Sequence, residues 1–208
     1  TISRSNTGTE IAPFVYTELT EYLVLEDAFP NGRPALERAG VYLTGRDTVE
    51  KAEKMKVGTC LNPLHTALAV YGCLLGCTSI AAEMRDQELR ALVEHIAEES
   101  LPVVEDPGIL SPRAFIHEVL NERFPNPAIP DTPQRIAADT SQKLPVRYGG
   151  TLRRYAERPE LDVSALVYAP LVFAGWCRYL LGVDDRGEEM PVSPDPMAPQ
   201  LQDHLAGI

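Results

Sequence analysis

Apolar residues recur at helical intervals along most of the chain, and the first forty-odd residues depart from this pattern. In the stretch 62–76, apolar side chains occupy nearly every side of a helix, so we expect this helix to be central and buried. Residues 86–99 show the spacing of a further helix. The pattern predicts a mainly α-helical fold built around one apolar helix.

The predicted helices have clear start signals. Asn62–Pro63, Ser111–Pro112 and Thr132–Pro133 each combine a capping residue with a proline at the first helical position. Either Asp47 or Thr48 can cap an earlier helix. The sequence therefore predicts where the main helices begin.

Prolines and small residues predict how some helices end and pack. Pro145 should close the helix that begins at Thr132, and Pro170 should kink a long apolar helix within residues 162–185. Gly72 belongs to a stripe of small residues along the central helix. We expect this stripe to let a neighbouring helix approach closely.

The N-terminal part of the chain is rich in Val, Tyr, Phe and Leu and predicts short strands instead. The runs 14–16, 22–25 and 40–44 have strand character, separated by a turn rich in proline and glycine. So few strands do not make a stable sheet alone. We therefore interpret residues 1–45 as terminal strands and linker of a larger domain, and residues 46–208 as a helical domain.

Composition and charge narrow the function classes. The chain has 208 residues with 30 acidic and 19 basic side chains, a net charge of −11, and no strong basic patch, which argues against binding nucleic acid or an anionic membrane surface. The longest apolar run is far shorter than the ~20 residues of a membrane span. Neither a secretory signal nor a glycine-rich phosphate loop is found. Four cysteines without a second pair at metal spacing favour reduced thiols in a cytoplasmic protein without a metal site.

Lys56, Asn62 and His65 are the polar residues at the start of the central helix. Taken singly, they can be a solvated lysine, an N-cap and a hydrogen-bonded core histidine. Together they place an amine, an amide and an imidazole at the positive end of a helix dipole. This environment disfavours the ammonium form of a lysine and suits a general base, while an amide can stabilise a developing alkoxide. The set predicts proton transfer at a hydroxyl group.

Further basic residues are candidates for substrate binding. Arg135, Asp139 and Lys143 recur every four residues, hence on one face of a predicted helix. They can form a ladder of surface ion pairs, or a basic pair that binds substrate hydroxyls or a carboxylate. Arg33 lies in a predicted turn and has the same two interpretations.

Three motifs together resemble the mannitol dehydrogenase family of polyol-specific long-chain dehydrogenases, which includes fructuronate reductases (D-mannonate oxidoreductases). In order along the chain they read EYLVLEDAFPNGRP, KVGTCLNPLHTALAVYGCLLG and NERFPNPAIPDTPQRIAADTSQKLPVR. The resemblance implies metal-independent interconversion of a secondary alcohol and a ketone with NAD or NADP. It also implies a helical domain like the C-terminal domain of 6-phosphogluconate dehydrogenase.

The resemblance also implies roles for individual residues. Lys56 would be the general base, Asn62 would polarise the reacting oxygen and His65 would bind substrate. Arg135 and Lys143 would contact substrate oxygens. The family usually has five residue steps from the lysine to the asparagine, whereas Lys56 and Asn62 are six apart. An inserted residue near Gly58 would absorb the difference; otherwise Lys54 is the next candidate base.

The family also places a dinucleotide-binding Rossmann domain before these motifs, and this chain does not contain one. We therefore expect the C-terminal catalytic portion of a sugar-acid or polyol dehydrogenase, inactive without that partner domain, which would bind NAD or NADP. D-mannonate/D-fructuronate is favoured over mannitol/fructose because the basic pair can meet a carboxylate. The alternative is a stand-alone, non-catalytic helical module for protein interaction or sugar binding.

Overall fold

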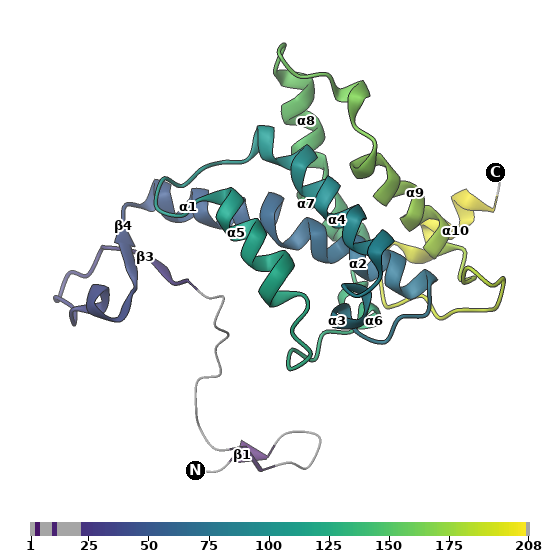
Figure 1. Ribbon diagram of the computed structural model, residues 1–208, viewed down its shortest axis with the longest axis horizontal. Coiled ribbons are helices and arrows are strands. Elements are labelled where there is room, and N and C mark those ends of the chain that lie inside the picture. Colours follow the sequence, from purple (N-terminus) through teal and green to yellow (C-terminus); the bar gives the residue numbers. More distant parts are fainter. Residues whose placement is uncertain (1–2, 5–9, 12–21, 207–208) are drawn as a thin grey trace.

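The computed structural model describes residues 3–4, 10–11 and 22–206, and this part of the chain is mainly helical (Figure 1). Its α-helices are α1 (Arg46–Met55), α2 (Asn62–Leu74), α3 (Ile80–Glu83), α4 (Gln87–Ser100), α5 (Pro112–Glu118), α6 (Pro133–Ile136), α7 (Thr140–Arg147), α8 (Gly149–Glu157), α9 (Tyr168–Leu180) and α10 (Ala198–Leu205). Two π-helical turns, η2 (Lys56–Cys60) and η4 (Val119–Arg123), continue α1 and α5. Three short 3₁₀ segments are η1 (Leu36–Ala39), η3 (Leu101–Val103) and η5 (Val163–Ala165). The predicted helical fold is confirmed.

The strands are short and precede the helices. β1 (Ser3–Arg4) pairs antiparallel with β2 (Glu10–Ile11), and β3 (Val24–Glu26) pairs parallel with β4 (Tyr42–Thr44). Strand structure is thus confirmed within two of the predicted runs, 22–25 and 40–44. The third predicted run, 14–16, lies outside the described residues.

Helix α2 lies at the centre of the fold, as its apolar sequence predicts. Leu64 and Leu68 are completely buried, and α4, α6, α7 and α9 all pack against this helix. Gly72 of α2 permits a close approach: a Cβ atom there would lie 2.0 Å from Glu83 Oε1 and 3.0 Å from Pro133 Cγ. The prediction that small residues let a helix pack closely against α2 is confirmed at Gly72.

The helix expected from Thr132 to Pro145 is two helices, which corrects the prediction. Asp139 has a φ of 53°, in the left-handed region, and this interrupts the helix between α6 and α7. Helix α7 then continues past Pro145, because a proline removes only one helical hydrogen bond and the chain can proceed beyond it. Arg135 and Lys143 consequently lie on different helices, so the single helical face predicted for them is wrong.

Some predicted helix starts are confirmed and others are wrong. The side chains of Ser111 and Thr132 each accept a hydrogen bond from the backbone N–H three residues further along the chain, as N-caps do. Asn62 is itself the first residue of α2, Leu61 occupies the N-cap position, and no N-cap side chain caps this helix. The first helix, α1, begins directly after Gly45, so the predicted caps Asp47 and Thr48 lie inside it.

The long apolar helix predicted within residues 162–185 is shorter than expected. Helix α9 begins at Tyr168, which puts Pro170 in its first turn, where the ring costs little and causes no kink. After α9 the chain returns to the core, where Asp195 accepts hydrogen bonds from the backbone and side chain of Ser141. Among the residues described, no helix is both long and apolar enough to cross a membrane.

Candidate functional site

The candidate site is built on the first two turns of α2. Asn62, His65 and Thr66 lie three and four residues apart and therefore share one face of the helix. The preceding turn, η2, is π-helical: the N–H of Leu61 donates to the carbonyl oxygen of Lys56, five residues back, over 3.2 Å. A π-turn holds one residue more than an α-turn. The sixth residue step between Lys56 and Asn62 is accommodated in this way.

Lys56 and Lys54 lie in different surroundings. Lys56 is exposed, and its Nζ lies 5.8 Å from the centre of the Tyr22 ring, a cation–π distance. Lys54 Nζ lies instead 3.5 Å from Glu105 Oε2. The two lysines that sequence spacing left as alternatives thus differ in their neighbours: an aromatic ring for Lys56 and a carboxylate for Lys54.

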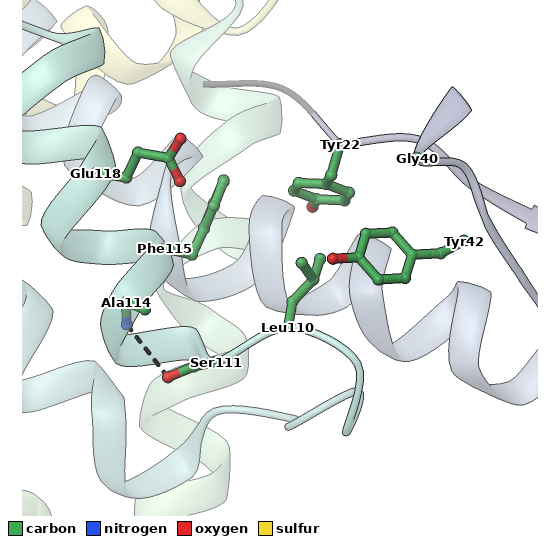
Figure 2. Close-up of a pocket in the computed structure, with 8 residues that line it drawn as sticks. All are labelled: Tyr22, Gly40, Tyr42, Leu110, Ser111, Ala114, Phe115 and Glu118. Atoms are coloured by element: carbon green, nitrogen blue, oxygen red, sulfur yellow. Dashed lines mark hydrogen bonds between the residues drawn. The ribbon is translucent and has the colours of Figure 1, made fainter. Parts of the chain in front are cut away.

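A pocket of about 290 Å³ lies beside Tyr22 (Figure 2). Its lining residues come from the segments around β3 and β4 and from α5 with the loop before it: Tyr22, Gly40, Tyr42, Leu110, Ser111, Ala114, Phe115 and Glu118. The rings of Tyr22 and Phe115 meet edge to face, 5.3 Å apart. Burial, and then the nearby Cys60, raise the pKa of Tyr22 to about 12, so its hydroxyl stays protonated at neutral pH.

Asp131 connects two of the predicted site residues. Its Oδ2 lies 3.3 Å from His65 Nε2, although the two groups are not aligned for a regular hydrogen bond, and its Oδ1 accepts from Arg135 Nη2. His65 is the main cause that lowers the pKa of the Asp131 carboxyl group, followed by Arg135 and Arg123. The backbone oxygen of Asp131 accepts from the N–H of Ile80 over 3.0 Å, which ties this segment to α3. Sequence reasoning missed Asp131; its position four residues before Arg135 was the available signal.

Lys143 and Arg147 are both half-buried on α7, which packs against α2. Lys143 Nζ donates to the carbonyl oxygens of Ile136, over 2.8 Å, and Ala138. Burial, then Arg147, lowers the pKa of Lys143, and burial also lowers the pKa of Arg147.

Arg147 reaches the start of α2 directly. Its Nη1 donates to the hydroxyl of Thr66 and, over 3.4 Å, to the backbone oxygen of Asn62. Sequence reasoning missed Arg147, although it continues the four-residue spacing of Lys143.

Arg33 is not brought to this cluster. It follows β3, where its Nε donates to Asp27 over 2.8 Å and its Nη1 to Glu37 over 2.7 Å. The two carboxylates hold its guanidinium in a network of exposed residues. A substrate contact for Arg33 stays a prediction.

The geometry thus gathers Asn62, His65, Arg135, Lys143 and Arg147 around one end of α2, with Lys56 on the turn before it. The cluster itself contains an amide, an imidazole and several cations, while the Lys56 amine lies over the ring of Tyr22. Among the described residues, no group of three or more His, Cys, Asp or Glu side chains is arranged to hold a metal ion.

Comparisons with known proteins agree with these observations. The sequence model of the mannitol dehydrogenase C-terminal domain matches residues 48–207. A D-mannonate oxidoreductase of Thermotoga maritima is 61% identical over 202 residues, which are 96% of this chain and 38% of that protein. The chain thus spans little more than a third of this relative.

Two solved structures resemble the fold over a similar share. A mannitol 2-dehydrogenase of Pseudomonas fluorescens, solved as a ternary complex with NAD and D-mannitol, matches with a TM-score of 0.73 and 34% identity over 88% of this chain and 36% of that one. A substrate-free D-sorbitol dehydrogenase matches with a TM-score of 0.75 and 29% identity over 86% of this chain and 36% of that one.

Proposed function

Since the chain belongs to the mannitol dehydrogenase C-terminal domain family, we propose that it is the substrate-binding part of an NAD(P)-dependent dehydrogenase that interconverts a secondary alcohol and a ketone. The clustering of Asn62, His65, Arg135 and Lys143 at one end of α2, which follows the turn that carries Lys56, is the observation that carries the proposal. A sugar acid, D-mannonate with its ketone D-fructuronate, is the preferred substrate pair. The 61% identity to a D-mannonate oxidoreductase supports this preference over mannitol and fructose.

In this proposal each candidate residue has its own role in binding or converting the substrate. Lys56 takes the hydroxyl proton during oxidation and returns it during reduction. The side-chain amide of Asn62 makes no hydrogen bond within the described part of the chain, so its N–H groups are available to the reacting oxygen. His65, steadied by Asp131, binds a substrate oxygen. Arg135 and Lys143 bind further oxygens.

The described residues do not form a dinucleotide site. The chain has no glycine-rich phosphate loop, and its parallel strands β3 and β4 are only a two-stranded pair. We propose that a preceding Rossmann domain, to which residues 1–45 contribute, binds NAD or NADP, and that residues 46–208 form the substrate domain. Parallel pairs normally belong to larger sheets covered by helices, which supports this division. The free cysteines support a cytoplasmic location.

The test uses the complete protein, assayed for reduction of D-fructuronate with NADH and with NADPH. Lys56→Ala should lower turnover by about 10³-fold or more, because the general base is lost. Lys54→Ala, which removes a neighbouring lysine paired with Glu105, should retain most of the turnover. Near-normal turnover of Lys56→Ala would overturn the base assignment. If the wild-type protein acts on neither sugar acids nor polyols, the non-catalytic module is favoured instead.

A further inference from the structure

Lys143 and Arg147 are two neighbouring cations, each held only by neutral oxygens. Lys143 donates to the carbonyl groups of Ile136 and Ala138, and Arg147 to the Thr66 hydroxyl and the Asn62 carbonyl. Neither forms a salt bridge with any carboxylate of the residues that the structure describes. Half-buried cations normally pair with an acid, because removing charge from water is costly. The pair therefore leaves positive charge available for an anion.

The surrounding acids do not cancel this charge at Arg147. Asp139 and Asp195 act on Lys143 only at longer range, and the Asp195 carboxylate is engaged by Ser141. The nearby third cation differs, because Arg135 is neutralised by its contact with Asp131. Arg147 also disfavours the charge of Lys143, a repulsion that a bound anion would relieve.

The guanidinium of Arg147 is oriented so that one edge stays available. Both of its hydrogen bonds come from Nη1, and Nε and Nη2 make none within the described chain. Nε–H and Nη2–H form the edge of an arginine that matches the two oxygens of a carboxylate. Nη1, on the other side of the guanidinium, donates to the Asn62 carbonyl, so Arg147 itself neighbours the residue proposed to bind the reacting oxygen.

We propose that Arg147 is the specificity-determining residue that binds the carboxylate of a sugar-acid substrate, with Lys143 as the supporting cation. The inference rests on the proposed function and deepens it. Arg147 selects the acid over the neutral sugar of the same length, because a neutral sugar offers a hydroxyl group where the acid offers a charged, bidentate partner.

The test compares a charged and a neutral substrate in the complete enzyme. Arg147→Gln should lower kcat/KM for D-fructuronate by about 30-fold or more, the lower end of the effect of losing one partner of a desolvated charge pair, with less than about 3-fold change for D-fructose. Arg147→Lys keeps the charge but not the bidentate guanidinium, so it should give an intermediate loss of kcat/KM. It also tests the proposal if Arg147→Gln folds poorly. Arg153→Gln removes an exposed arginine of α8 as a charge-matched control and should leave both values unchanged.

Equal losses for the two substrates, or no loss for D-fructuronate, would overturn the proposal and leave Arg147 with a structural role at the start of α2. Calorimetric binding of D-mannonate and D-mannitol to wild type and Arg147→Gln separates this failure from that of the proposed function. A wild type without turnover that still binds D-mannonate through Arg147 would overturn only the enzyme proposal. Equal binding of D-mannonate by wild type and variant would overturn the carboxylate site.

Discussion

The carboxylate of Asp131 lies 3.3 Å from the imidazole Nε2 of His65 and binds Arg135 with its other oxygen. This one side chain thereby links helix α2 to helix α6 at the candidate site. The carboxylate is thus hydrogen-bonded to the guanidinium and lies close to the imidazole.

We predict that His65 controls the titration of Asp131. Since His65 is the main cause of the lowered pKa, His65→Gln should raise the pKa of the Asp131 carboxyl group, measured by carbon NMR. A carboxyl group whose pKa is lower in the folded than in the unfolded state stabilises the fold when the pH is above its unfolded-state pKa. This stabilisation is lost as the pH falls through its folded-state pKa. Acid unfolding should therefore begin at a higher pH in His65→Gln than in wild type. An unchanged Asp131 titration would show that the pair does not interact in solution.

Asn62→Ala separates catalysis from helix capping. Because the Asn62 side chain makes no cap hydrogen bond, its removal should change the free energy of unfolding by less than about 0.5 kcal/mol. In the complete enzyme the same change should lower turnover by about 100-fold or more. Asp86→Ala is the matched control: Asp86 caps α4 through two hydrogen bonds, so its loss should cost about 1 kcal/mol, measured by urea unfolding. A comparable destabilisation by Asn62→Ala would restore the capping interpretation.

Glu83 should make stability depend on pH. Its side chain is completely buried, neither carboxyl oxygen has a hydrogen-bond partner, and burial raises its pKa to about 9. The folded state thus keeps a proton that the unfolded state releases above about pH 4.5, so stability should fall as the pH rises from there towards 9. The slope is at most about 1.4 kcal/mol per pH unit.

The measurement is thermal unfolding by circular dichroism between pH 5 and pH 9. Glu83→Gln keeps the shape of the side chain but cannot ionise, so its stability should change less across this range than that of wild type. The two curves should converge at the acid end and diverge towards pH 9. Parallel curves would mean that Glu83 is ionised or solvated in the folded protein.

Gly72→Ala should destabilise the packing of α2 against α3 and α6. The added methyl group would lie 2.0 Å from Glu83 Oε1 and 3.0 Å from Pro133 Cγ, so a buried side chain has to move, at a cost of about 1–3 kcal/mol. Gly150→Ala is the control: the added methyl group at this helical glycine meets nothing within 4 Å, and alanine should stabilise α8 by about 0.5–1 kcal/mol. Opposite shifts in denaturation midpoint are expected, and two shifts of the same sign would contradict the packing geometry.

Local sequence signals determined much of the fold. The helical spacing of apolar residues identified α2 as the central helix, because a helix apolar on nearly every side can only be buried. Ser111 and Thr132 were identified correctly as caps, because a hydroxyl before a proline satisfies free backbone N–H groups locally. Residues Asn62 and His65 were placed together by their separation of three along one helix.

Only the tertiary structure decided the rest. The break at Asp139 depends on a left-handed backbone conformation, where its N–H donates to the carbonyl of the distant Pro194, and the spacing of charges gives no signal of it. The pairing of Asp131 with His65 and of Arg147 with Thr66 joins segments far apart in the sequence, so periodicity within one helix could not reveal it. The π-turn at Lys56–Cys60 likewise follows from fitting one residue more between α1 and a buried α2. The sequence by itself indicated Asn62, His65, Arg135 and Lys143 as candidates, whereas the packing around α2 brought them near Asp131 and Arg147, because these contacts join distant segments.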